Sequence, residues 1–130
     1  FLAIQHAAAY CLDHPEITEQ ISEKYSRRMD GLVGVLSSFG FDAQKPRGSF
    51  FLYVPSPIAA VQENGERIEF KSGEDASQWL IREKLISTVP WDESGAFLRF
   101  SVTFAGVGEA AEQKVLGEIK NRLGGVTFEF

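Results

Sequence analysis

The sequence predicts an α+β fold in which helices pack on one face of a small antiparallel sheet of three to four strands, with a long helix near the N-terminus. Apolar residues recur every three or four positions in segments 16–39 and 108–123, as expected for helices with one buried face. In segments 49–54 and 97–104 the pattern changes to a period of two, which is typical of half-buried strands. The length of 130 residues predicts a single domain over residues 1–130.

Two helices are predicted at the N-terminus. The first is the Ala-rich segment from Phe1 to Leu12, which ends before Pro15 because proline disfavours α geometry in the preceding residue. The second runs from Glu16 to Phe39 and stops at Gly40. At about 1.5 Å per residue it would be about 36 Å long, more than the core of so small a domain needs. We therefore expect part of it to pack on a region that lies outside this chain.

The middle of the chain is predicted to contain strands, a tight turn and one helix. Ser49 to Val54 forms a half-buried strand, and residues 41–44 are its expected antiparallel neighbour. Asn64-Gly65 has the residue types of a two-residue hairpin turn. Ser72 begins a helix, and residues 86–89 form a short edge strand that Pro90 stops.

The last strand and the last helix complete the predicted fold. Between residues 97 and 104 the apolar side chains point to one face of the strand and the polar ones to the other. The final helix runs from about Gly108 to Leu123 and ends at Gly124-Gly125. Its predicted inward residues are Ala111, Val115, Ile119 and Leu123.

Composition and charge exclude several kinds of partner. Thirteen basic and eighteen acidic side chains give a net charge of -5, so no positive field attracts nucleic acid. No stretch approaches the roughly eighteen apolar residues of a membrane span. Cys11 is the single cysteine, which excludes an internal disulfide, and with His6 and His14 it gives no complete set of metal ligands. We expect a cytoplasmic protein without a metal site and, because the chain starts at Phe1 without an initiator Met, a piece of something longer.

Arg99 is the residue whose position in the sequence most needs an explanation. It lies in the middle of the alternating strand, on the face that also contains Ser101 and Thr103. A guanidinium stays charged in proteins, and its desolvation is costly unless an anion meets it. The guanidinium of Arg99 therefore either binds a substrate carboxylate through two parallel hydrogen bonds, or forms an internal salt bridge, or simply lies on a solvated sheet face.

Two other patterns have ordinary structural interpretations. The segment from Gly106 to Ala111 has the outline of a dinucleotide-binding turn, but such a site follows a continuously apolar parallel strand, whereas residues 97–104 alternate. Lys24, Arg27 and Arg28 form a small basic patch on the long helix, and we expect this patch to be a solvated flank.

Four segments, in this order, resemble the carboxy-terminal small domain of class I/II aminotransferases, the fold type I enzymes that depend on pyridoxal phosphate. Tyr25 to Leu32 resembles the family's helix signature of Tyr, Arg-Arg and Asp. Pro46 to Leu52 is similar to its Pro-x-Gly-x-Phe-Tyr-Leu strand. Ile86 to Pro90 and Phe97 to Ser101 resemble the segment in which a Val-Pro-Gly loop leads to an Ile-Arg-Leu-Ser strand. The match spans most of the chain, and the overall similarity is to LL-diaminopimelate aminotransferases.

The resemblance implies site residues. In the family the strand arginine that matches Arg99 binds the α-carboxylate of the amino-acid substrate. Arg47, Ser49, Pro90 and Trp91 would border the site. Trp91 stands where the family usually has a glycine, which would narrow or reshape the loop beside the substrate. The alternative to this enzymatic role is a non-enzymatic α+β binding module in which Arg99 forms a structural salt bridge.

The resemblance also implies a cofactor and partners. The intact protein would use pyridoxal 5'-phosphate to transfer an amino group between an amino acid and a 2-oxo acid, and it would be a homodimer. The Schiff-base lysine and the other cofactor contacts belong to the family's large domain, and none of the six lysines here lies in the family's Ser-x-x-Lys loop. We therefore expect no catalytic or cofactor-binding residue in this chain, and no activity from it alone. Its expected task is to close over the cofactor and bring Arg99 to the substrate.

Overall fold

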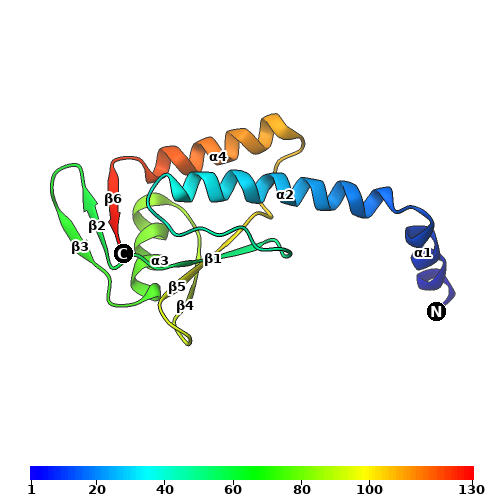
Figure 1. The fold of residues 1–130 in the computed structure, drawn as a ribbon, viewed down its shortest axis with the longest axis horizontal. Coiled ribbons are helices and arrows are strands. Elements are labelled where there is room, and N and C mark those ends of the chain that lie inside the picture. The colour runs from blue at the N-terminus through cyan, green and yellow to red at the C-terminus, as the bar shows by residue number, and fades with distance from the viewer.

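The computed structural model describes residues 1–130 and contains four helices and six strands (Figure 1). The helices are α1 (Leu2–Asp13), α2 (Glu16–Ser37), α3 (Gly73–Lys84) and α4 (Glu109–Leu123). The strands are β1 (Phe51–Pro55), β2 (Ala59–Gln62), β3 (Arg67–Glu69), β4 (Val89–Trp91), β5 (Phe97–Ser101) and β6 (Val126–Glu129). The predicted α+β class and the predicted N-terminal helices are confirmed.

The strands form two antiparallel sheets of three strands each, whereas the prediction placed all strands in one sheet. Sheet A has the strand order β1-β5-β4, and sheet B has the order β3-β2-β6. A turn at Asn64-Gly65 joins β2 to β3 as predicted, but it is longer than the predicted two residues, because β2 ends at Gln62 and β3 begins at Arg67. Gly65 has a positive φ of 83°, whereas Asn64 does not have the positive φ of a two-residue Asn-Gly turn. Strand β6, which the sequence analysis did not predict, pairs with β2 and completes sheet B. Because β5 pairs antiparallel with both of its neighbours, it is not the parallel strand of a dinucleotide-binding unit.

One hydrophobic core joins the helices to sheet A. Leu52, Val54, Leu98 and Phe100 point to the inner face of this sheet, and all four are buried. The same cluster includes side chains from three helices, namely Met29, Leu32 and Leu36 of α2, Ala76 and Leu80 of α3, and Leu116 and Leu123 of α4. The helices therefore pack on the inner face of sheet A, as predicted, and its outer face stays outside the core.

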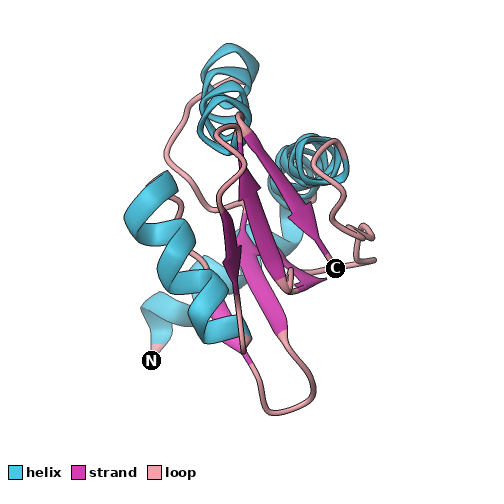
Figure 2. Cartoon of the chain, turned by 90° about the vertical axis from the view of Figure 1, so that its left-hand side faces the viewer, coloured by secondary structure: helices cyan, strands magenta, loops and turns pink.

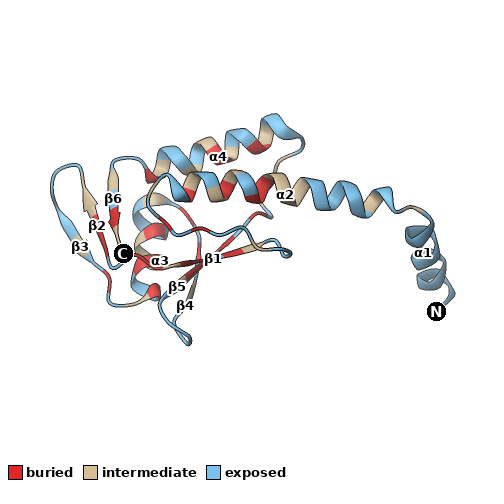
Figure 3. Cartoon of the chain, viewed as in Figure 1, coloured by how far each residue is buried: buried red, intermediate tan, exposed pale blue.

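Helix α1 and the first half of α2 contribute no buried residue to this core. All buried residues of α2 lie at or after Arg28, and α1 has none. Figure 3 shows this division along α2, and Figure 1 shows α1 beyond the far end of α2, away from the sheets. The large apolar side chains Phe1, Leu2, Ile4, Tyr10 and Leu12 are exposed. None of the helices is both long enough and apolar enough to cross a membrane.

Two predicted strands differ from the structure. Residues 41–44 are not a strand, because their backbone bonds locally, with Ala43 N–H donating to the carbonyl of Phe41 at 2.9 Å, instead of pairing with β1. The side chain of Phe41 is buried, with its ring centroid 6.3 Å from that of Phe100 in sheet A and 5.1 Å from that of Phe128 in sheet B. The edge strand does not stop at Pro90 but runs from Val89 to Trp91. Proline is tolerated there because β4 is the edge of sheet A and needs only one row of hydrogen bonds.

The buried face of α4 is rotated relative to the prediction. Glu112, Leu116 and Leu123 are buried, whereas Val115 and Ile119 are only half-buried. Helix α4 runs beside α2 (Figures 1 and 2), and the two backbones approach closely where Gly31 faces Leu116. A Cβ atom added to Gly31 would lie 2.3 Å from Leu116 Cδ1. The absence of a side chain at this position therefore permits the close packing of the two helices.

We predict opposite effects of alanine at two glycines of α2. Gly31→Ala forces Leu116 to move in a packed contact and should lower the free energy of unfolding by about 1 to 3 kcal/mol. Gly34→Ala is the matched control, because nothing lies within 4 Å of its added Cβ, and it should raise stability by about 0.5 to 1 kcal/mol through helix propensity. Urea unfolding of both variants measures the difference. A stabilising Gly31→Ala would contradict the close contact between α2 and α4.

Candidate functional site

The outer face of sheet A is a mostly aromatic surface with one cation in the middle. It consists of the side chains that point away from the core in three strands, namely Phe51 and Tyr53 of β1, Val89 and Trp91 of β4, and Phe97, Arg99 and Ser101 of β5. Tyr53, Val89 and Trp91 are 40 to 45% exposed, which is unusual for a group of large side chains that lie together. A contiguous exposed aromatic patch of this kind indicates a binding or interaction surface.

Arg99 lies at the centre of this face, opposite Tyr53 in one neighbouring strand and Val89 in the other. Its guanidinium carbon is 4.4 Å from the centroid of the Phe51 ring. Arg99 takes part in none of the ion pairs of the chain, so no acidic side chain neutralises it. The internal salt bridge that the binding-module alternative requires is not formed in this structure. The N–H donors of Arg99 remain available to an anion from outside the chain.

Trp91 lies on the same face as Arg99, and helix α3 anchors the residue that follows it. Its ring meets that of Tyr53 edge-on, with the centroids 6.0 Å apart. The next residue, Asp92, accepts hydrogen bonds from the backbone N–H groups of Gly73 and Glu74 at the start of α3, at 2.7 and 3.0 Å. These bonds satisfy donors that a helix N-terminus leaves free, and they attach the end of β4 to the helix. The short strand β4 is therefore fixed even though it has only three residues.

The remaining predicted border residues do not share this face. Pro90 lies opposite Leu98, so it points to the inner side of sheet A. Arg47 and Ser49 line a separate cavity of about 390 Å³ between the start of β1 and helix α2. Ser49 has a φ of 82°, which is rare outside glycine, and its hydroxyl accepts a hydrogen bond from the backbone N–H of Phe51. Of the predicted residues, the structure thus brings Trp91 and Arg99 to one face and leaves Arg47, Ser49 and Pro90 elsewhere.

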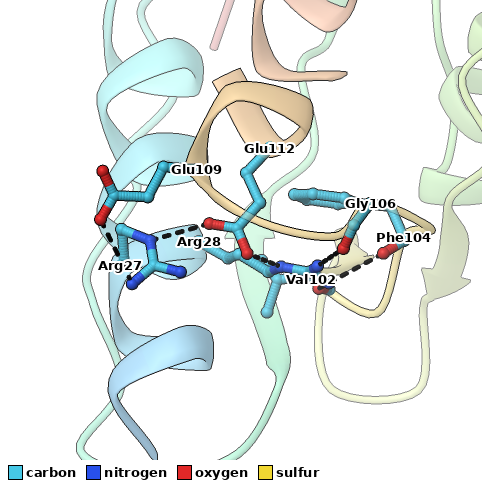
Figure 4. Close-up of polar contacts among 7 residues, drawn as sticks. All are labelled: Arg27, Arg28, Val102, Phe104, Gly106, Glu109 and Glu112. Carbon is cyan, nitrogen blue, oxygen red and sulfur yellow. Dashed lines mark hydrogen bonds and ion pairs between the residues drawn. The ribbon is translucent and has the colours of Figure 1, made fainter. Parts of the chain in front are cut away.

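Arg28, which we predicted to be solvated, is instead buried, and the prediction of a solvated basic patch is wrong for this residue. Figure 4 shows its guanidinium between α2, α4 and the segment that follows β5. Arg28 Nε donates to Glu112 Oε1 at 2.8 Å, and the two terminal nitrogens donate to three backbone carbonyls. These belong to Val102, Phe104 and Gly106, at 3.2, 2.8 and 2.6 Å. A buried guanidinium with its donors used in this way fixes the path of the chain directly after the strand that contains Arg99.

Glu112 is the acceptor that connects both arginines of α2. Its second carboxylate oxygen accepts a hydrogen bond from Arg27 Nε at 2.8 Å, and Arg27 also approaches Glu109 at 3.7 Å. The hydrogen bonds from Arg27 and Arg28 hold the pKa of Glu112 below its ordinary value, against the opposing effect of burial. The sequence signal for this arrangement is weak: Glu112 lies on the same helical face as Leu116 and Leu123, but its partners are 84 and 85 residues away.

Comparison with known proteins gives two relatives that match the chain over its whole length. The LL-diaminopimelate aminotransferase of Methanocaldococcus jannaschii is 49% identical over 138 aligned residues, and that of Methanococcus maripaludis is 44% identical over 135. The resemblance to aminotransferases is confirmed. This chain spans about a third of each relative, 32% of its length. No family model matches the chain.

The fold itself is also that of a solved aminotransferase structure. The aspartate aminotransferase of Rhizobium meliloti superimposes with a TM-score of 0.63 over 84% of this chain and 27% of that protein. The sequences are 23% identical in this comparison, so it supports the fold alone. Both kinds of comparison match this chain to a portion of a longer aminotransferase.

We predict that Arg28→Ala destabilises the fold far more than the same substitution of a surface arginine does. The substitution leaves Glu112 buried without one of its two cations and leaves three carbonyls without a donor, which should cost about 3 to 5 kcal/mol of unfolding free energy. Arg82→Ala is the control, because Arg82 is exposed on α3 and forms no ion pair, and it should change stability by no more than about 0.5 kcal/mol. Equal effects of the two substitutions in chemical denaturation would contradict the structural role of Arg28.

We predict a loss of stability in acid that depends on Glu112. Because the pKa of this carboxyl is lowered in the folded chain, its contribution is complete above the unfolded value of about 4.3 and is lost as pH falls through the lower folded pKa. The thermal midpoint of the chain should therefore exceed that of Glu112→Gln at pH 6 to 8, and the gap should shrink below about pH 4. A difference in thermal midpoint that stays constant down to pH 3 would show that the arginine partners do not stabilise the ionised form of Glu112.

Proposed function

We propose that this chain is the small domain of a pyridoxal-phosphate-dependent aminotransferase and that Arg99 binds the α-carboxylate of its amino-acid and 2-oxo-acid substrates. One observation supports this role above the others: the guanidinium of Arg99 lies on the outer face of sheet A without an acidic partner. The 49 and 44% identity to two LL-diaminopimelate aminotransferases makes LL-diaminopimelate the amino-acid substrate that we propose.

A guanidinium in this position suits a carboxylate for geometric and electrostatic reasons. Its planar fork can donate two parallel hydrogen bonds to the two carboxylate oxygens, which fixes both the position and the orientation of the bound acid. If the remainder of the intact protein covers this face, water would be excluded from it, and the charge pair would be stronger than on an open surface. Orientation of the substrate by a fixed charge pair lowers the entropic part of the reaction barrier.

The covalent chemistry would have to come from the remainder of the intact protein. Pyridoxal phosphate supplies an electron sink for the substrate carbanion, and its attachment needs a nucleophilic lysine. None of the six lysines here is buried; Lys45 pairs with Asp30, and Lys84 donates to the carbonyl of Gly124. We propose that none of these lysines attaches the cofactor, and that the other two thirds of the relatives' length correspond to the part that holds it.

The same division suggests a partner for the exposed N-terminal helices. Helix α1 has no buried residue. Five large apolar side chains, Phe1 just before the helix and four within it, are 58 to 92% exposed. We propose that α1 and the first half of α2 pack on the large domain of the intact protein. This arrangement would let the outer face of sheet A close over the substrate. The homodimer expected from the family stays a prediction.

We predict that Arg99→Lys in the full-length protein weakens substrate binding through the lost carboxylate contact. Lysine keeps the positive charge but loses the planar guanidinium that donates two parallel hydrogen bonds. The expected loss in kcat/KM for LL-diaminopimelate corresponds to about 2 to 5 kcal/mol. Arg82→Lys is the matched control, because Arg82 lies on an exposed helix face away from sheet A, and it should leave the kinetics unchanged. Unchanged kinetics in Arg99→Lys would contradict the carboxylate-binding role of Arg99.

A further inference from the structure

The orientation of Arg99 needs an explanation, because no acidic group of the chain holds its side chain. An arginine side chain without contacts adopts many rotamers. A site binds its ligand more tightly when the guanidinium is already oriented, because less conformational entropy is lost on binding. We propose that Phe51 is the positioning residue that holds the guanidinium of Arg99 in the plane in which it receives the substrate carboxylate. This inference rests on the function proposed above.

The contact between the two residues supports this role. Phe51 pairs with Ser101 in the register of β1 and β5, so it lies diagonal to Arg99 on the same face of sheet A. The guanidinium carbon is 4.4 Å from the Phe51 ring centroid, within the distance at which a cation is attracted to an aromatic face. Phe51 is half-buried, so part of its ring packs against neighbouring side chains.

A line of aromatic contacts supports the Phe51 ring from behind. Its centroid is 4.7 Å from that of Phe50, and the Phe50 ring in turn lies 5.9 Å from that of Tyr25 in α2. Tyr25 also lies under the guanidinium of the buried Arg28, at 5.9 Å. The Phe51 ring is therefore connected to the part of α2 that the core fixes, and not only to the edge strand β1.

Stacking is suited to a residue that must stay available to a ligand. An aromatic ring contacts the flat face of a guanidinium and uses none of its N–H donors, which lie in the plane. An acidic partner would occupy the same donors that bind the substrate and would compete with it. Phe51 can thus fix the plane of Arg99 while its donors stay free.

The other neighbours of Arg99 do not provide this contact. Tyr53 lies directly opposite Arg99 in the register, but its ring packs edge-on against Trp91, with centroids 6.0 Å apart. Val89, on the other side, has no aromatic face. Of the side chains around Arg99, Phe51 is the one with its ring under the guanidinium.

The test compares carboxylate preference in variants of the full-length protein. The preference is the ratio of kcat/KM for LL-diaminopimelate to kcat/KM for its diamide, in which neutral amides replace both carboxylates. Phe51→Leu removes the aromatic face and should lower this ratio about tenfold, mainly by raising KM for the acid, while kcat/KM for the diamide changes less than about twofold. Phe51→Tyr keeps the ring and should retain the ratio. Phe130→Leu, a half-exposed phenylalanine that contacts Phe41, is the control and should have no effect.

Each outcome separates positioning from other roles. Equal losses for the acid and the diamide in Phe51→Leu, or an unchanged ratio, would overturn the positioning role. If Phe51→Leu does not fold, Phe51→Met makes the same comparison, and circular dichroism melting of each variant identifies such a failure. A ratio that falls in Arg99→Lys but not in Phe51→Leu contradicts this inference alone, whereas a ratio that falls in neither contradicts the proposed function of Arg99 itself.

Discussion

The buried ion pair between Arg28 and Glu112 is the constraint on which the arrangement of the rest of the chain depends. It joins the middle of α2 to the first turns of α4, and the same guanidinium binds the carbonyls of Val102, Phe104 and Gly106. A charge in the interior is tolerated only when its donors are satisfied, so these three segments must meet at one point. Their meeting fixes the end of β5, and thereby the strand from which Arg99 projects.

Two arginines, one within β5 and one bound to the segment that follows it, therefore have opposite roles. Arg28 is 2% exposed, and all the partners it needs lie within the chain, so it stabilises the structure. Arg99 has no anionic partner in the chain, and its one described contact is with the face of an aromatic ring. A guanidinium held by stacking keeps its hydrogen-bond donors for a ligand. The difference between the two sites follows from their partners, because the side chains are chemically identical.

Local sequence patterns predicted most elements and the face on which Arg99 lies, because strand and helix periods depend on near neighbours alone. Contacts between distant segments could not be predicted in this way. Arg28 was expected in solvent because its acceptor, Glu112, follows 84 residues later. Strand β6 was missed because its four residues become a strand only by pairing with β2. The burial of Phe41 between the two sheets likewise depends on a second sheet that the pattern did not indicate.

The most direct measurement is a crystal structure of the full-length protein with LL-diaminopimelate or an unreactive dicarboxylate analogue bound. The proposed role of Arg99 predicts two hydrogen bonds of about 2.7 to 2.9 Å from its guanidinium to one carboxylate group of the ligand, with the Phe51 ring still stacked on its face. A guanidinium of Arg99 that is instead bound to an Asp or Glu of the protein, with the ligand carboxylate elsewhere, would contradict it.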